Sequence, residues 1–252
     1  MGLTISWNLE LNSASIDEVR AKIAHLRKLA LKLPFQQVEE LVEIEGEACI
    51  FDKYDLQDPH IFLKLRGLKA TDIALNGCSA VDSTYLIAFD SLPGEGCETA
   101  AFGLAAHSDP LESVNDWYWT GFCKTQYASN PQYGGMQNFV NCHLAIVTML
   151  DEAQKLGITC DVTDGSDYWE NRDINGLVDS VRESNLLIAA LTGSISNQFK
   201  TTDTKIYAPI LEYPNFEYLE AEGAREQGGL GDKGTRGRRA GEQGAGEQGD
   251  RS

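Results

Sequence analysis

The residues best suited to chemistry lie in one short run, FCKTQYASNPQYGGMQNFVNCHL, at positions 122–144. Cys123 could act as a nucleophile with His143 as its base, because a thiol needs a neighbouring base to react readily at neutral pH. The turn expected at 129–135 could bring the end of one strand close to the first turns of the next helix. Cys123 and His143 are therefore the catalytic candidates.

The same residues also fit a packing role. His143 shares the apolar side of a predicted helix with Phe139 and Ile146, and buried histidines and cysteines are common in protein cores. Cys142 points about 100° away from His143 around the helix. The second interpretation is that the thiols and the imidazole fill space between a helix and a sheet.

Aromatic residues form the second candidate site. Aromatic side chains are favoured in the cores of binding interfaces, and the segment 116–128 is rich in them. Gly134 and Gly135 precede a predicted helix, whose first N–H groups could face an anion, although a simple turn explains the pair equally well. The predicted binding residues are Trp117, Trp119, Tyr127, Tyr133, Gly134, Gly135 and Trp169.

Metal and cofactor motifs are absent from the sequence. The acidic run CDVTDGSDYWENRD at 160–173 lacks the spacing of a calcium loop, and the four histidines are scattered. There is no C-x-x-C pair, phosphate-binding loop, dinucleotide fingerprint or G-x-S-x-G elbow. We expect neither a metal site nor a cofactor.

Charge limits the partners. The chain has 252 residues and a formal net charge of −17, which repels phosphate backbones and anionic lipid. No apolar run approaches the roughly 18 residues of a membrane span, and the first residues lack the pattern of a signal peptide. We therefore expect a cytoplasmic protein whose partner is a protein or a small molecule, with no nucleic acid and no membrane.

Periodicity predicts the elements that must position these residues. Alternation over 3–11 indicates a strand, and a capping box at Ser15 with an apolar stripe ending at Pro34 indicates a helix. Further strands are predicted at 38–46, 48–52, 60–67, 83–94, 98–108, 116–128 and 158–164, and further helices at 136–156 and 174–195. The strands at 83–94 and 98–108 are expected to form a hairpin about a loop that contains glycine and proline. Because the strands come in a run, they predict an α+β fold with a mixed, mainly antiparallel sheet covered by about three helices.

The domain prediction follows composition. Residues 1–220 are expected to form a single α+β globular domain. Residues 221–252 are rich in glycine, contain a repeated GEQG and carry little that could be buried, so they are expected to form a disordered low-complexity tail.

Several segments resemble an uncharacterised family of small bacterial proteins. The resemblance covers roughly residues 1–220 and rests on segments in the same order: MGLTISWNLEL, LRKLALKLPFQQVEELVEIEG, FCKTQYASNPQYGG, NFVNCHLAIVTMLDEAQKLG and YWENRD. No activity is assigned to that family, so the resemblance implies a bacterial origin and no function.

Two main hypotheses of function remain, and a metal-dependent role through the carboxylates of 160–173 stays open beside them. The first is a non-catalytic soluble protein that binds a protein or small-molecule partner through an aromatic surface, since no complete catalytic constellation is visible. The alternative is a cysteine-dependent hydrolase or transferase that uses Cys123 and His143.

Overall fold

The computed structural model describes residues 3–12, 15–71, 79–107, 116–199 and 206–235. The chain divides into two compact units, Met1–Ser184 and Asn185–Ser252. The first unit contains a mainly antiparallel sheet with helices against it, so the predicted α+β class is confirmed. Among the described residues, no helix is long and apolar enough to cross a membrane.

One seven-stranded sheet organises the first unit. Its strands follow the order β2-β6-β7-β8-β1-β9, with β3 also paired to β6, and every pairing is antiparallel. The strands are β1 (Thr4–Asn12), β2 (Gln37–Val38), β3 (Val42–Glu45), β6 (Tyr85–Leu92), β7 (Ala100–Ala106), β8 (Asp116–Lys124) and β9 (Thr159–Asp164). The predicted hairpin is confirmed, because β6 pairs with β7 directly.

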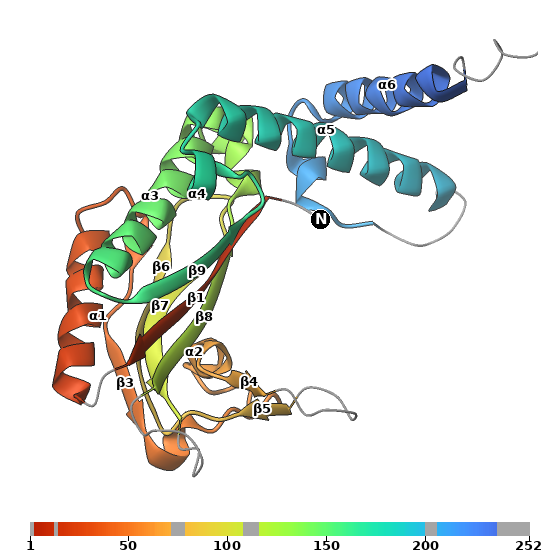
Figure 1. The fold of residues 1–252 in the computed structure, drawn as a ribbon. Helices are drawn as coiled ribbons and strands as arrows, with labels where there is room; N and C mark the ends of the chain where they lie inside the picture. Colours follow the sequence, from red (N-terminus) through yellow and green to blue (C-terminus); the bar gives the residue numbers. More distant parts are fainter. Residues whose placement is uncertain (1–2, 13–14, 72–78, 108–115, 200–205, 236–252) are drawn as a thin grey trace, which may run out of the picture. The chain divides into compact units, whose positions relative to one another are not determined.

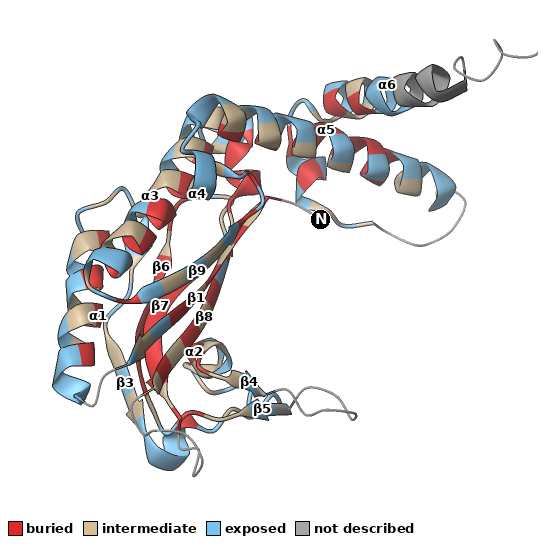
Figure 2. Cartoon of the chain, viewed as in Figure 1, coloured by how far each residue is buried: buried red, intermediate tan, exposed pale blue. Residues whose placement is uncertain are grey.

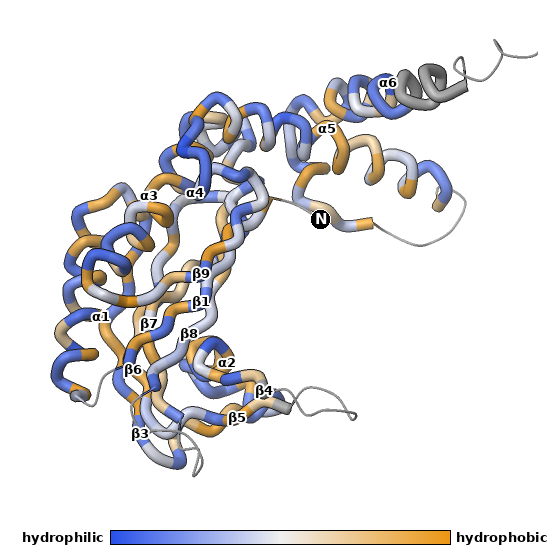
Figure 3. Tube along the Cα trace, in the orientation of Figure 1, coloured by the Kyte–Doolittle hydropathy of each residue, from blue (hydrophilic) through white to orange (hydrophobic). Residues whose placement is uncertain are grey.

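Strand β1 shows why sequence alternation fixes which face is buried. Ile5, Trp7 and Leu9 are buried, whereas the residues between them are partly exposed. Side chains in a strand point alternately to the two faces, so this pattern places the core on one side. Strands β6 and β7 are apolar along most of their length (Figure 3), and they lie near the centre of the sheet.

Helices α1 (Ile16–Ala30) and α3 (Gly135–Lys155) cover that face of the sheet (Figure 1). The Ser15 hydroxyl accepts a hydrogen bond from the Glu18 N–H at 3.2 Å, which satisfies a free donor at the start of α1. The inward sides of both helices are buried and their outward sides exposed (Figure 2). The buried residues of α1 are Val19, Ile23, Leu26 and Ala30.

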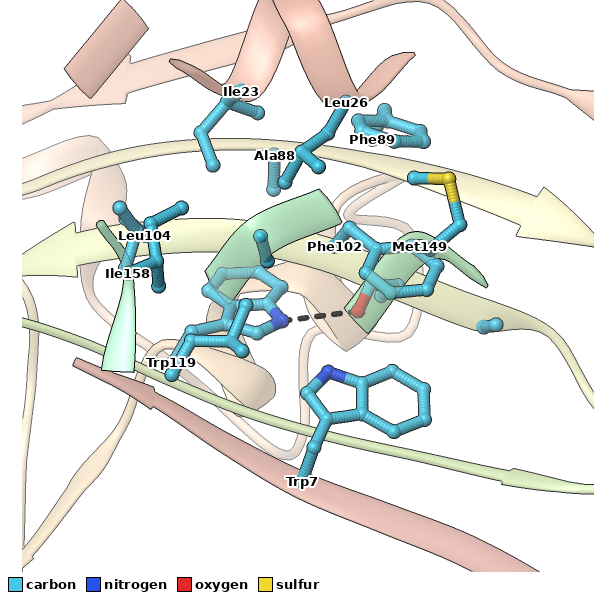
Figure 4. Close-up of a cluster of buried hydrophobic side chains, with 14 of the residues drawn as sticks. Trp7, Ile23, Leu26, Ala88, Phe89, Phe102, Leu104, Trp119, Met149 and Ile158 are labelled. Atoms are coloured by element: carbon cyan, nitrogen blue, oxygen red, sulfur yellow. Dashed lines mark hydrogen bonds between the residues drawn. The ribbon is translucent and has the colours of Figure 1, made fainter. Parts of the chain in front are cut away.

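The core between these layers is built around aromatic rings. Trp7 stacks on Phe102 with 5.1 Å between ring centroids, and Phe102 contacts Phe89 at 5.9 Å. Figure 4 shows these rings beside Trp119, whose indole Nε1 donates to the Ala101 carbonyl at 3.1 Å. Trp7 lies so close to β8 that a Cβ at Gly121 would clash with its ring, so this position of β8 requires glycine.

The opposite face carries helix α2 (Ile61–Arg66) and a two-stranded sheet of β4 (Lys69–Thr71) and β5 (Ser79–Val81) (Figure 1). The strand predicted at 60–67 is therefore wrong. The Asp58 carboxylate accepts from the His60 N–H just before the helix, and the Gly67 N–H bonds back to Leu63. These local bonds, with Leu63 packed inward, favour one short helix over an extended chain.

Residues 48–52 are also not a strand. The 3₁₀ helix η1 covers Gly46–Cys49, and Gly46 has a φ of 61°, a left-handed conformation that glycine adopts without strain. The chain turns at this glycine and leaves the sheet after β3, so no strand partner is present for Cys49 and its neighbours in the described sheet.

The second unit contains the end of helix α5 (Ile174–Phe199) and helix α6 (Phe216–Thr235). Leu219 is buried, and Gly223 brings α6 so close to the Leu186 carbonyl that no Cβ would fit there. Helix α6 begins at Phe216, before the predicted tail, and its described residues continue to Thr235. Residues 236–252 of the predicted tail lie outside the described residues.

Candidate functional site

His143 lies in α3 with both ring nitrogens engaged. Its Nδ1 is 3.2 Å from the Thr125 hydroxyl, and its Nε2 is 3.0 Å from Oδ2 of Asp164. The carboxylate can only accept, so Nε2 carries the proton donated to Asp164. The Tyr168 ring meets the imidazole edge-on at 5.9 Å between centroids. His143 is therefore held by partners on three separate segments of the chain.

Asp164 ends β9 and accepts four hydrogen bonds. Oδ1 accepts from the Ser166 N–H and hydroxyl at 2.9 and 2.7 Å, and Oδ2 accepts from His143 and from the Trp169 N–H at 3.0 Å each. Burial opposes ionisation of this carboxyl, but the hydrogen bond and charge of His143, with the bonds from Ser166, outweigh it and hold the pKa of Asp164 below its usual value.

This network contains the group types of a hydrolase triad, a hydroxyl, an imidazole and a carboxylate. It differs from a catalytic triad because solvent and substrate cannot reach it. The side chains of His143 and Asp164 are 1% and 0% exposed, and Thr125 is fully buried. No substrate reaches these groups in this conformation, so the network ties the end of β8 to α3 and to the loop after β9.

Cys123 lies on β8 with its side chain fully buried. Its thiol donates to the Glu98 carbonyl at 3.0 Å. Among the hydrogen bonds of the described residues, none joins Cys123 to His143, whose ring nitrogens bind Thr125 and Asp164. The structure does not bring the two catalytic candidates into the contact that proton transfer requires.

Cys123 belongs instead to a group of three thiols. Cys97 lies near both Cys123 and Cys142, and the Cys142 thiol donates to the side-chain oxygen of Asn138 at 3.6 Å. The neighbouring Cys123 thiol raises the pKa of the Cys97 thiol, and the Cys97 thiol raises the pKa of Cys142, with burial adding to both. Cys97 and Cys142 therefore stay protonated at neutral pH, which opposes a role as nucleophiles.

The two tryptophans of the predicted binding surface lie in the core. Trp117 is 4% exposed and meets the Tyr85 ring edge-on, and Trp119 is 0% exposed. Both point to the face of β8 that α1 and α3 cover, because they alternate with the partly exposed residues of that strand. Neither ring is open to a partner, so the expectation of a surface that contains them is wrong.

The other predicted aromatic residues are half-buried and lie on separate short elements. Tyr127 is in the 3₁₀ helix η2 (Gln126–Ser129), Tyr133 is in η3 (Pro131–Tyr133), and Trp169 is in helix α4 (Tyr168–Asn171). Lys124 lies over the Tyr127 ring and Arg172 over the Trp169 ring, at 4.6 and 4.5 Å from the centroids. Within the described part of the chain, no ring contact joins these three aromatic residues.

Gly134 and Gly135 form the turn into α3. Both have positive φ, 100° and 65°, which explains the glycine pair. Their N–H groups bond to the carbonyls of Pro131 and Asn130. The N–H groups of the glycine pair itself are thus already bonded within the turn.

A solvent-accessible hollow lies on the opposite face of the sheet, beside α2. It has a volume of about 250 Å³ and an apolar lining, and we call it the Phe122 pocket. Its walls include Phe62, Arg66, Asp90, Glu98, Ala101 and Phe122. Asp90 and Ala101 are paired across β6 and β7, so the sheet forms its floor and α2 one side.

Two aromatic rings in the Phe122 pocket are open to solvent. Phe62 is 72% exposed and Phe122 is 38% exposed. The Arg66 guanidinium carbon lies over the Phe122 ring, 3.7 Å from its centroid. With the residues that the structure describes, this guanidinium makes no hydrogen bond and no ion pair. A stacked guanidinium keeps its N–H groups available at its edges.

The charges of the pocket are incompletely compensated. Burial lowers the pKa of Arg66 despite the attraction of Glu98 and Asp90. Burial and the nearby Glu39 raise the pKa of Asp90 more than Arg66 and His60 lower it. Each charged form thus lacks part of the stabilisation that water would give it, and a ligand of suitable charge could restore it.

A second hollow of about 310 Å³ has a more polar lining that includes Glu10, Lys69, Asp116 and Tyr118. In the described ranges, no three His, Cys, Asp or Glu side chains are placed to hold a metal ion.

Comparison with known proteins adds no template for either site. No protein-family model, no curated protein and no solved structure matches this chain.

The sequence did not reveal the central residues of the His143–Asp164 network or of the Phe122 pocket. Asp164 stood in the acidic run that was weighed for calcium, and nothing local pointed to a contact with His143. Arg66 was assigned to a strand, which concealed its position at the end of a helix. Phe122 is the first residue of the segment 122–144, but its exposure on the face of the sheet opposite α1 and α3 follows only from the register of β8.

Proposed function

We propose that this protein is a non-catalytic binder of a small organic molecule with a flat apolar group, which it holds in the Phe122 pocket. The observation that carries the proposal is the Arg66 guanidinium, which stacks on Phe122 and makes no hydrogen bond or ion pair with a described residue, beside the exposed rings of Phe62 and Phe122. Ligand sites in proteins combine apolar and aromatic walls with a few polar groups in this way.

The size of the pocket limits the ligand. A volume of about 250 Å³ equals the space of roughly eight liquid water molecules at about 30 Å³ each. This is smaller than most drug-sized sites, which begin near 300 Å³. The proposal is therefore a metabolite whose bound part is one ring or one branched chain.

Binding is favoured over the cysteine-enzyme hypothesis by the contacts of the described residues. Cys123 is buried and bonded to a carbonyl, and His143 is committed to Thr125 and Asp164. The expected aromatic recognition is kept in this proposal, but it moves to Phe62 and Phe122 on the opposite face of the sheet.

The proposal is tested by titrating the full chain with indole and following backbone amide shifts by NMR. We expect the largest shifts at Phe62, Arg66 and Phe122. Phe62→Ala should weaken indole binding by about 10-fold or more, because a buried aromatic contact contributes roughly 1.5–3 kcal/mol.

Leu56→Ala is the matched control, since Leu56 is 79% exposed and does not line the pocket. It should leave the affinity unchanged. Shifts centred elsewhere, or equal affinity in the Phe62→Ala protein, would contradict the proposal.

A further inference from the structure

The Phe122 pocket presents both signs of charge within one small space. Arg66 supplies a guanidinium, and Asp90 and Glu98 supply carboxylates. Neither Arg66 nor Asp90 is ion-paired with a described residue. The three charged groups are near enough to interact electrostatically, but the guanidinium makes its close contact with the Phe122 ring.

A ligand with a single charge fits this arrangement poorly. A carboxylate alone would meet Asp90 and Glu98 and the net charge of −17 of the whole chain. An ammonium alone would meet Arg66. Like charges placed together cost binding energy, whereas complementary charges give specificity. A molecule that carries both groups close together matches the pocket, with its carboxylate on Arg66 and its ammonium towards Asp90 and Glu98.

The apolar walls of the pocket indicate the third feature of the ligand, an apolar or aromatic group. Phe62 and Phe122 line the same pocket and leave ring surface open to solvent. We infer that the ligand of the Phe122 pocket is a free α-amino acid with an apolar or aromatic side chain, bound as its zwitterion. This inference rests on the proposed function and adds the chemical class of the ligand. An amino acid with one ring also agrees with the volume of about 250 Å³.

The test compares three ligands that differ only in their charged groups. L-phenylalanine, phenethylamine (which lacks the carboxylate) and 3-phenylpropionate (which lacks the ammonium) are each titrated into the full chain by calorimetry, with NMR to locate binding. We expect L-phenylalanine to bind about 10- to 100-fold more tightly than either analogue, the range for one charge-assisted hydrogen bond.

Substitutions at Arg66 and Asp90 test which residue binds which charged group of the ligand. Arg66→Gln should remove the preference for L-phenylalanine over phenethylamine. The variant has no guanidinium to bind the carboxylate, which only L-phenylalanine carries. Asp90→Asn should reduce the preference over 3-phenylpropionate. Arg66→Lys should give an intermediate result, since lysine keeps the charge but not the planar pair of donors.

The outcomes separate this inference from the proposed function. Equal binding of all three ligands, each weakened by Phe62→Ala, would overturn the zwitterion and leave the pocket as a binding site. If N-acetyl-L-phenylalanine amide, blocked like a peptide residue, bound as well as L-phenylalanine, a free amino acid would also be overturned. If neither these ligands nor indole shifted the pocket residues, both proposals would fail.

Discussion

Replacing Asp164 by asparagine should destabilise the protein strongly while changing only one atom. Each oxygen of this carboxylate accepts two hydrogen bonds, at 2.7–3.0 Å. If the amide nitrogen faces Ser166, the Ser166 N–H loses its acceptor, while the Ser166 hydroxyl can turn to accept from the amide. If the amide nitrogen faces the other way, the His143 ring N–H and the Trp169 N–H both lose their acceptor. Neither orientation of the asparagine side chain keeps all four hydrogen bonds.

The magnitude follows from this count. Hydrogen bonds to a charged group contribute about 1.5–3 kcal/mol each, so the loss of one or two corresponds to roughly 1.5–6 kcal/mol. We therefore expect the free energy of unfolding of Asp164→Asn to fall by about 2–5 kcal/mol, a large part of the typical stability of a domain.

The assay is urea unfolding at pH 7, monitored by circular dichroism. Asp161→Asn is the matched control, because Asp161 is on the same strand but exposed. That control should stay within about 0.5 kcal/mol of the unchanged protein. A loss in Asp164→Asn no larger than that of the control would refute the argument that this network stabilises the fold.

Acid provides an independent check. The pKa of Asp164 in the folded protein is below its usual value, which is about 3.9 in the unfolded chain. Its contribution to stability is therefore complete above that value and is lost as the pH falls through the folded pKa. The difference in stability between Asp164→Asn and the unchanged protein should be constant from pH 7 to about 5 and shrink below about pH 4. A difference that stayed constant into acid would show that the charge of Asp164 contributes nothing.

Three further substitutions test the core and the pocket. Trp119→Ala should lower the unfolding free energy by about 3–5 kcal/mol in urea, since this ring is fully buried; unchanged stability would remove it from the core. Gly121→Ala should cost about 1–3 kcal/mol because its Cβ would lie 2.3 Å from the Trp7 ring, whereas Gly165→Ala, with its nearest neighbour at 3.4 Å, should cost less than about 0.5 kcal/mol. Asp90→Asn should slightly raise the melting temperature at pH 7, because folding raises the pKa of Asp90 and so disfavours its charged form. That gain should vanish by about pH 3, where the carboxyl is protonated in both states, and a gain that persisted there would have another cause.

Several elements were predictable because their signals are local. The alternation of β1, the Ser15 cap with the stripe of α1, and the buried side of α3 ending at Gly157 each follow from residues within a few positions. The period of a strand or helix decides which side chains share a face, whatever lies opposite. The same reasoning failed at 60–67, where a short apolar run fits a strand and a helix equally well and contacts with the sheet decided for a helix.

By itself, the sequence determined the α+β class and the antiparallel hairpin, and it placed His143 on the apolar side of its helix without deciding between packing and catalysis. Only the tertiary structure decided what His143 touches, because Asp164 is 21 residues away and reaches it through the return of the chain along β9. It likewise placed Trp119 inside and Phe122 outside, and it brought Arg66 from a separate helix onto the Phe122 ring. The physical reason is that side-chain chemistry depends on neighbours in space, and strand register and helix packing bring those neighbours from distant positions in the chain.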